Sequence, residues 1–271
     1  MVQMLSSSRK GDNGVSHLIF QISPIDNLRL LSQCKFTRVS QWALDNFLEV
    51  HEVRHAAAAN EFYRHISGEK DAAALWGQVF ERLVFKHLAG TDAECEFPIR
   101  GLSESILEPT TWTFRGPMPC FEFASNSRRK DHIIGAITDA VQNANPLHLV
   151  PSARNFGAVD SIVYDPNEEV LTLIQVTVGS KHGISVPGLE RIQNWLEPKT
   201  LLAPLRPSKE KSKSKTGVQA RNGPWRLIFI VPSHCEASFE LQPFKHDTTQ
   251  GEWAGKLHQY VLGLDVIKKL E

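Results

Sequence analysis

Two apolar segments joined by a short polar turn constrain the fold of this chain more than any other feature. Residues 158–164 (AVDSIVY) and 170–178 (VLTLIQVTV) are rich in β-branched residues, and the sequence DPNEE at 165–169 is typical of a tight turn. A turn over Pro166 to Glu169 pairs Asp165 with Val170. The pattern therefore predicts an antiparallel hairpin in which Asp160 lies opposite Gln175.

This pairing gathers polar groups on one face of the predicted hairpin. Opposite residues have Cβ atoms roughly 4.5–5.5 Å apart, and Thr177 projects on the same face as Gln175. A slip of one residue would turn Gln175 to the other face. A carboxylate inside an apolar strand is costly unless it binds a metal, a cation or hydrogen-bond donors. Asp160 is therefore either a ligand-binding residue or a capped or salt-bridged structural aspartate.

The rest of the chain predicts a mixed α/β fold. Apolar spacing favours helices over residues 40–66, 71–88, 133–143, 186–196 and 253–270. Short apolar runs favour strands near residues 17–22, 94–99, 111–114, 120–123 and 225–231. We expect residues 1–68 to form a small, mostly helical N-terminal segment and residues 69–271 to form the main domain.

Composition excludes several classes of protein. The 271 residues carry 30 Lys+Arg against 30 Asp+Glu and are 41% hydrophobic, which argues against a disordered chain. The four cysteines form no CxxC pair, so neither a disulfide framework nor a cysteine zinc site is expected. The sequence shows no signal peptide and no apolar run of membrane-spanning length, so an intracellular protein without a membrane partner is the expectation.

Three short segments carry a resemblance to a known family. They are Asn155–Asp160 (NFGAVD), Leu173–Thr177 (LIQVT) and Lys181–Ile184 (KHGI). Together with the order of predicted elements they resemble the PD-(D/E)xK nuclease superfamily, and most specifically the nuclease-type C-terminal domain of Crinkler effectors. The resemblance covers about residues 70–232. It implies a restriction-endonuclease-like core of helix, mixed β-meander, helix and strand.

The resemblance implies a Mg²⁺-dependent (or Mn²⁺-dependent) endonuclease that acts on DNA. Its metal ligands would be Asp160, Gln175, the Val176 carbonyl and Glu81, the last on the helix over 71–88. Gln175 stands where the superfamily usually has an acid, and Thr177 stands where it usually has lysine. Lys181 or His182 would then supply the missing positive charge, so the implied catalytic set is Glu81, Asp160, Gln175, Thr177, Lys181 and His182.

The implied partner is a nucleic acid, expected to be DNA. Basic residues that could contact its backbone are Arg128, Arg129, Lys130, Lys181, Lys209, Lys211, Lys213, Lys215 and Arg221. The lysine-rich run over 209–215 is equally compatible with a solvated loop. A second copy of the chain or a host protein is left open as a further partner. The resemblance also implies an effector or toxin, secreted or intracellular, that acts in a nucleus.

Two other functions remain as alternatives. The substitutions at Gln175 and Thr177 are compatible with a nuclease fold that binds nucleic acid or a host protein without cleaving it. The segment His51-Glu52-x-x-His55 matches a zinc metalloprotease motif, with a third ligand from Glu61, His65 or Glu69. Arg54 places a charge inside that motif, which argues against the protease and favours two histidines on an ordinary helix.

Overall fold

The computed structural model describes two units of the chain. The described residues are 20–24, 34–38, 56–69, 72–90, 94–103, 110–116, 118–123, 130–151, 156–157, 159–168, 170–197, 200–208, 224–245 and 252–266. The first unit contains the described residues up to Arg82 together with Asp265 and Val266, and the second runs from Leu83 to Leu264. The division falls within helix α3 (Ala73–Ala89), whereas the sequence suggested a division after residue 68.

The first unit contains a short antiparallel β-ribbon and a helix. Strand β1 (Phe20–Pro24) pairs with β2 (Cys34–Arg38), and α2 spans Ala56–Gly68. Helix α2 confirms the end of the helix predicted over 40–66, while its earlier part lies outside the described residues. His51, Glu52 and His55 also lie outside them, and Glu61, His65 and Glu69 are exposed.

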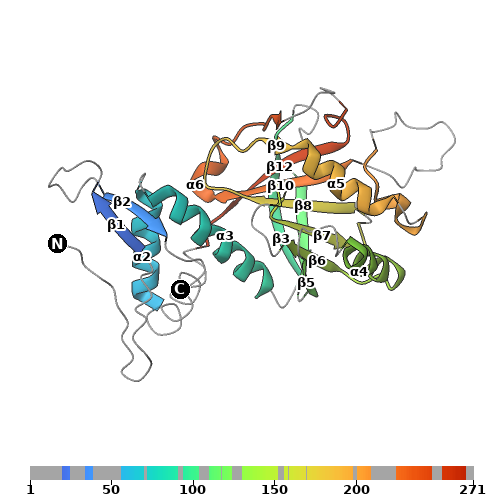
Figure 1. Ribbon diagram of the computed structural model, residues 1–271, viewed down its shortest axis with the longest axis horizontal. Helices are drawn as coiled ribbons and strands as arrows, with labels where there is room; N and C mark the ends of the chain where they lie inside the picture. Colours follow the sequence, from blue (N-terminus) through green and yellow to red (C-terminus); the bar gives the residue numbers. More distant parts are fainter. Residues whose placement is uncertain are drawn as a thin grey trace, which may run out of the picture. The chain divides into compact units, whose positions relative to one another are not determined.

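The described residues of the second unit form an eight-stranded mixed sheet (Figure 1). Its strands are β3 (Glu94–Gly101), β4 (Thr110–Arg115), β5 (Cys120–Phe123), β6 (Leu147–Pro151), β7 (Ser161–Asp165), β8 (Val170–Val176), β10 (Trp225–Pro232) and β12 (Leu257–Leu264). They are ordered β4-β3-β12-β10-β8-β7-β6-β5. Strand β10 is parallel to both β8 and β12, and β6, β7 and β8 form an antiparallel meander.

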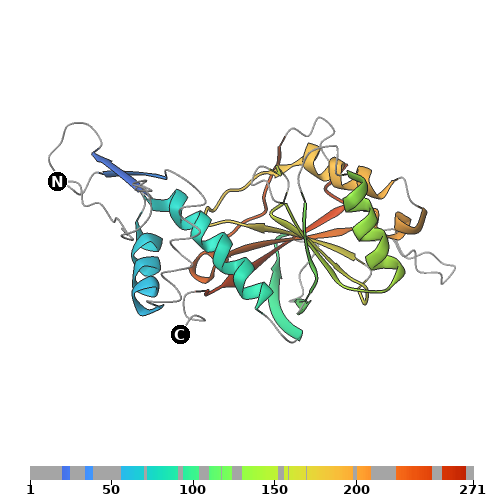
Figure 2. The ribbon, with the colours of Figure 1, turned by 60° about the horizontal axis from the view of Figure 1, so that its bottom comes forward.

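One face of this sheet carries the hydrophobic core. Leu173 of β8 and Leu227 and Phe229 of β10 are at most 1% exposed on it. Two helices cover this face side by side, α4 (Lys130–Gln142) and α5 (Val186–Leu196), followed by a 3-10 turn η3 (Thr200–Leu205) (Figures 1 and 2). Central strands that are buried on both faces consist of continuous apolar runs, and β8 and β10 could therefore be predicted from the sequence.

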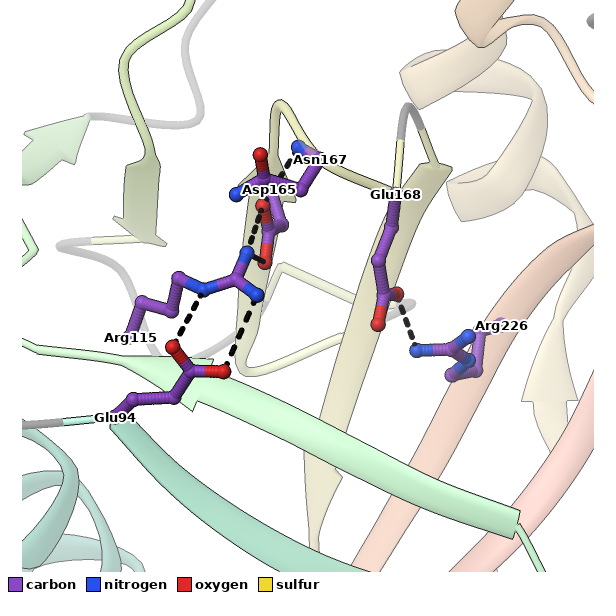
Figure 3. A network of polar contacts seen from close by, with 6 residues as sticks. All are labelled: Glu94, Arg115, Asp165, Asn167, Glu168 and Arg226. Atoms are coloured by element: carbon purple, nitrogen blue, oxygen red, sulfur yellow. Dashed lines mark hydrogen bonds and ion pairs between the residues drawn. The ribbon is translucent and has the colours of Figure 1, made fainter.

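The β7–β8 hairpin has the predicted register. Asp165 pairs with Val170 and Ser161 pairs with Ile174, which confirms the turn over Pro166 to Glu169. The turn is held from both sides (Figure 3). Arg115 of β4 binds both carboxylate oxygens of Asp165 (3.0 and 2.8 Å), and Arg226 of β10 binds Glu168 (2.7 Å).

The Arg115–Asp165 pair also shows that the sheet is strongly curled. Strand β4 is an edge strand, yet it reaches β7, and Phe114 of β4 contacts the His148 ring of β6 at 6.2 Å between centroids. Phe85 of α3 also packs against the His148 ring, with 6.0 Å between the ring centroids. The face opposite the α4–α5 layer is therefore closed by β4 and the end of α3.

Replacing Arg115 with methionine should destabilise the fold more than replacing Glu94 with glutamine. The Asp165 side chain is only 7% exposed and would keep the hydrogen bond from the Asn167 N–H, whereas Glu94 is 53% exposed and stays hydrated. The measurement is the urea midpoint of each variant. Equal midpoints for the two variants would show that Arg115 does not stabilise a buried carboxylate.

Parts of the sequence-based prediction were wrong or incomplete. Residues 257–264, expected in a helix over 253–270, form strand β12, because this apolar run is buried between β10 and β3. Short apolar runs do not distinguish a buried strand from a buried helix by periodicity alone. Strand β6 was missed, and α4 lies directly before the meander, after α3 and three strands. No helix among the described residues is long and apolar enough to cross a membrane.

Candidate metal and phosphate site

Asp160 and Gln175 meet across the hairpin as the register requires. The Gln175 Nε2 donates a hydrogen bond to Asp160 Oδ2 (2.6 Å), and the Val176 N–H donates to the same oxygen (2.7 Å). The Asp160 N–H in turn donates to the Ile174 carbonyl (2.8 Å), which extends the ladder by one residue. A carboxylate and a side-chain amide therefore lie in direct contact where β7 begins and β8 ends.

Aromatic packing holds the segment that leads into Asp160. Phe156 stacks on Trp195 of α5 with centroids 5.4 Å apart, and Phe123 meets both rings edge-on at 5.4 and 5.5 Å. Val159 is 2% exposed in the same core. The backbone before β7 is thereby anchored to α5. The Asp160 side chain stays half-buried and the Gln175 side chain is 7% exposed.

The backbone of Val176 also faces Asp160. Thr177 N–H bonds to Ile230 of β10 (3.0 Å), whereas Val176 N–H bonds to Asp160 on the other side. The N–H and C=O of one strand residue point to the same side, so the Val176 carbonyl projects toward the β7 side of β8. The three oxygen-bearing groups predicted as metal ligands in this unit, on Asp160, Gln175 and Val176, are therefore adjacent.

Thr177 has a local role in the turn that follows. Its hydroxyl oxygen accepts the Gly179 N–H (3.1 Å), which fixes the start of the loop after β8. A threonine hydroxyl that closes a turn of this kind is a common backbone motif. Thr177 carries no charge, so it cannot supply the positive charge that the nuclease resemblance implies for this position.

The loop over residues 178–183 carries Lys181 and His182. Lys181 is exposed. The His182 ring lies 6.5 Å from the ring of Phe229, the residue that pairs with Gln175 in β10, so it is on the same face as Asp160. Burial, together with the charge of Lys245, lowers the pKa of His182. The neutral form of the His182 imidazole is therefore favoured at neutral pH.

Two glutamines that the sequence analysis did not single out hold this loop. The Gln242 side chain accepts the His182 N–H and donates to the Ser180 (3.2 Å) and Glu240 (2.7 Å) carbonyls. Its backbone exchanges two hydrogen bonds with the Gln259 side chain on β12 (2.9 and 3.0 Å). Both glutamines are at most 4% exposed. Buried amides whose side-chain nitrogen and oxygen atoms are both hydrogen-bonded give a loop a defined position.

Lys245 is a further residue that the sequence did not reveal. The short strands β9 (Ile184–Ser185) and β11 (Phe244–Lys245) pair in parallel, which sets Lys245 beside Ser185. This contact links segments about sixty residues apart, and sequence periodicity does not predict contacts between distant segments. No local pattern signals it, because a two-residue strand is too short to show alternation.

The donor set fits a weak Mg²⁺ or Mn²⁺ site. Mg²⁺ is commonly held by one or two carboxylates, with waters and substrate phosphates completing its octahedron. Asp160 supplies one carboxylate, and Gln175 would present Oε1 after turning its amide over. In the part of the chain that the structure describes, no three His, Cys, Asp or Glu side chains gather in a way that could hold a metal.

Of the remaining predicted site residues, one lies in the first unit, one begins α4, and the others lie outside the described residues. Glu81 lies in the part of α3 that belongs to the first unit, where it is half-buried. Lys130 is the first residue of α4 and is half-buried. Outside the described residues lie Arg128, Arg129, Lys209, Lys211, Lys213, Lys215 and Arg221.

The helix directly before the meander carries two other acids. Asp131 and Asp139 of α4 are both exposed. Neither was predicted as a site residue, and no contact with Asp160 is seen for them among the described hydrogen bonds. Comparison of the chain with protein-family models, with curated proteins and with solved structures found no match.

Proposed function

We propose that the chain is a metal-dependent nuclease of the PD-(D/E)xK type that hydrolyses DNA. The observation that carries the proposal is the direct contact between Asp160 and Gln175 at the junction of β7 and β8. The order α4, β6, β7, β8, α5, β10 supports it, since this is a helix, a three-stranded meander, a helix and a strand. The effector or toxin role implied by the Crinkler resemblance is part of the same proposal.

Each residue of the site has a chemical role under this proposal. Asp160, the Gln175 side-chain oxygen and the Val176 carbonyl would hold the divalent ion. The ion, when bound, would activate a water and offset charge on the phosphate. Water oxygen bonds to phosphorus, one phosphorus–oxygen ester bond breaks, and the leaving oxygen takes up a proton. Lys181 would attract the phosphate backbone, while Gln242 keeps the loop that carries it in place.

The proposal is tested by incubating the full chain with supercoiled plasmid and with RNA. Each substrate is tested in separate arms with Mg²⁺, Mn²⁺ and EDTA. We expect nicked and linear plasmid in the two metal arms and intact plasmid in EDTA. Intact plasmid in both metal arms would overturn the nuclease proposal for DNA, and degradation of RNA alone would reassign the substrate.

Replacing Gln175 with glutamate should make the stability of the fold depend on metal. Two adjacent carboxylates without a cation lose the Gln175–Asp160 hydrogen bond, which should cost about 1–3 kcal/mol in EDTA. Mn²⁺ should restore the loss, because a second carboxylate strengthens the donor set. The measurement is the thermal midpoint in Mn²⁺ minus that in EDTA.

Gln142→Glu is the matched control for this variant. Gln142 is exposed at the end of α4, so the same change of charge should leave its midpoint independent of Mn²⁺. A Gln175→Glu variant whose midpoint is equal in Mn²⁺ and EDTA would argue against an ion between residues 160 and 175.

A binding module without cleavage is the second candidate function. The observations that favour it are the hydrogen-bond donor, not the oxygen, of Gln175 facing Asp160, and the use of the Thr177 hydroxyl in a turn. Asp160 is then a structural acceptor that fixes the end of β8. Retardation of DNA in a gel without cleavage in any divalent metal is the outcome that would select this function.

A further inference from the structure

The side chain of Lys245 lies directly across the backbone of Gly183. A Cβ atom added to Gly183 would overlap the Cγ, Cδ and Cε atoms of Lys245. Glycine at position 183 therefore leaves the space that the lysine stem occupies. The Gly183 backbone lies outside the left-handed region, so its importance here is the missing side chain and not an unusual φ.

This lysine belongs to the same corner of the molecule as Asp160 and Gln175. Lys245 pairs with Ser185, and Gly157, three residues before Asp160, lies close to Ser185, since its Cβ would be 3.7 Å from the Ser185 Oγ. Gly183 follows His182, whose ring lies against Phe229, the neighbour of Gln175. The lowering of the His182 pKa, caused first by burial and then by Lys245, agrees with this proximity.

The segment that leads into Lys245 is held by hydrogen bonds at Pro243 and Gln242. The Ile184 N–H donates to the Pro243 carbonyl (2.9 Å), and Gln242, one residue further back, is tied to His182, Ser180 and Gln259. The stem of Lys245 thus starts from an anchored strand and is supported along its length by Gly183. Its ammonium group remains part of an exposed residue.

We propose that Lys245 binds a phosphate of the DNA backbone at the Asp160–Gln175 site. It supplies the positive charge that Thr177 does not carry, and it does so from a strand about seventy residues further along the chain. A lysine ammonium is a compact point charge, so this contact attracts phosphate without reading base sequence. The inference rests on the proposed function for the identity of the ligand, but binding is measured without cleavage.

The experiment measures binding of the full chain to DNA in EDTA. The probe is a fluorescein-labelled duplex of about 20 base pairs, read by fluorescence anisotropy at several salt concentrations. Lys245→Met should weaken binding roughly tenfold at low salt and lower the slope of log K against log salt by about 0.9, the value for one lost phosphate contact. Lys245→Arg should keep the wild-type slope.

Two further variants make the result specific to the position of the lysine. Gly183→Ala keeps every charge but displaces the Lys245 stem, so it should also weaken binding. Lys256→Met removes a lysine near the start of β12, at the other end of the parallel strands, where Lys256 pairs with Glu252 (2.7 Å). It should leave both affinity and slope unchanged. Thermal midpoints of all variants check that each one folds.

The outcomes separate this inference from the proposed function. Lys245→Met with wild-type affinity and slope would overturn the inference, even if the chain cleaves DNA. Equal losses in Lys245→Met and Lys256→Met would also overturn it, because the effect would then be one of net charge alone. Loss of binding in Lys245→Met by a chain that never cleaves DNA would support the inference and contradict the nuclease.

Discussion

Replacing Asp160 with asparagine should reduce metal-dependent cleavage of plasmid by about a thousandfold. Asparagine keeps an oxygen that can accept the Val176 N–H, so the end of β8 should remain in place. The substitution removes the negatively charged carboxylate of Asp160, which is the strongest candidate metal ligand in the second unit. The loss should therefore appear in the rate and not in the stability of the fold. The measurement is the initial rate of plasmid nicking in Mg²⁺ and in Mn²⁺.

Asp139→Asn is the control for this prediction. Asp139 is exposed on α4 and has the same charge, so its replacement should leave the cleavage rate within about twofold of wild type. An Asp160→Asn variant that cleaves at the wild-type rate would exclude Asp160 as a metal ligand. It would also assign any cleavage by the chain to residues outside this site.

The free energy of unfolding should fall by about 3 kcal/mol between about pH 7 and pH 4, because His148 binds a proton more readily in the unfolded chain than in the folded protein. His148 is 5% exposed on β6, and burial lowers its pKa to about 4. Its ring lies against Phe85 and Phe114, and no described partner bonds to its Nε2 atom. The folded protein therefore keeps this ring neutral at a pH where a histidine in the unfolded chain is charged.

The direction of the effect follows from proton binding. Below about pH 6.5 the unfolded chain binds a proton at this histidine and the folded protein does not, so each step toward acid favours unfolding. The stabilising contribution is complete above pH 6.5 and is lost as the pH falls to about 4, where the folded protein also binds the proton. Carboxylates add their own acid dependence, so the histidine has to be isolated by substitution.

His148→Phe isolates this contribution. Phenylalanine fills the space between Phe85 and Phe114 and cannot bind a proton, so the variant should lose the pH dependence that wild type shows over this window. His132→Gln is the control, because His132 is exposed on α4 and should leave the dependence unchanged. The measurement is the urea unfolding free energy at several pH values. Parallel curves for wild type and His148→Phe would refute a buried neutral histidine.

The sequence predicted the part of the site that depends on local geometry. Turn chemistry at Asp165 to Glu169 set the register, and the register alone placed Asp160 against Gln175. Helices α3 and α5 and strands β3, β4, β5 and β10 were also predicted, each from its own apolar spacing. These elements share one property, namely that neighbouring residues along the chain determine them.

The features that the sequence did not predict depend on distant contacts. Strand β12 is a strand because β10 and β3 flank it, and nothing within the run LHQYVLGL requires that. Lys245 lies beside Ser185 through the pairing of β11 with β9, and Gln242 is held by its bonds with Gln259. Hydrophobic periodicity predicts the secondary structure of one segment at a time. It therefore does not predict which loops are brought together by elements that are distant in the sequence.

The most direct test of the central claim is to locate the ion. Crystals of the full chain with Mn²⁺ and a duplex that carries non-hydrolysable phosphorothioate linkages would give an anomalous difference map. We expect a peak beside the Asp160 carboxylate, with the Gln175 oxygen turned toward it. A map that shows bound duplex, no peak at Asp160, and Gln175 still donating its hydrogen bond to that carboxylate would contradict a metal site at Asp160.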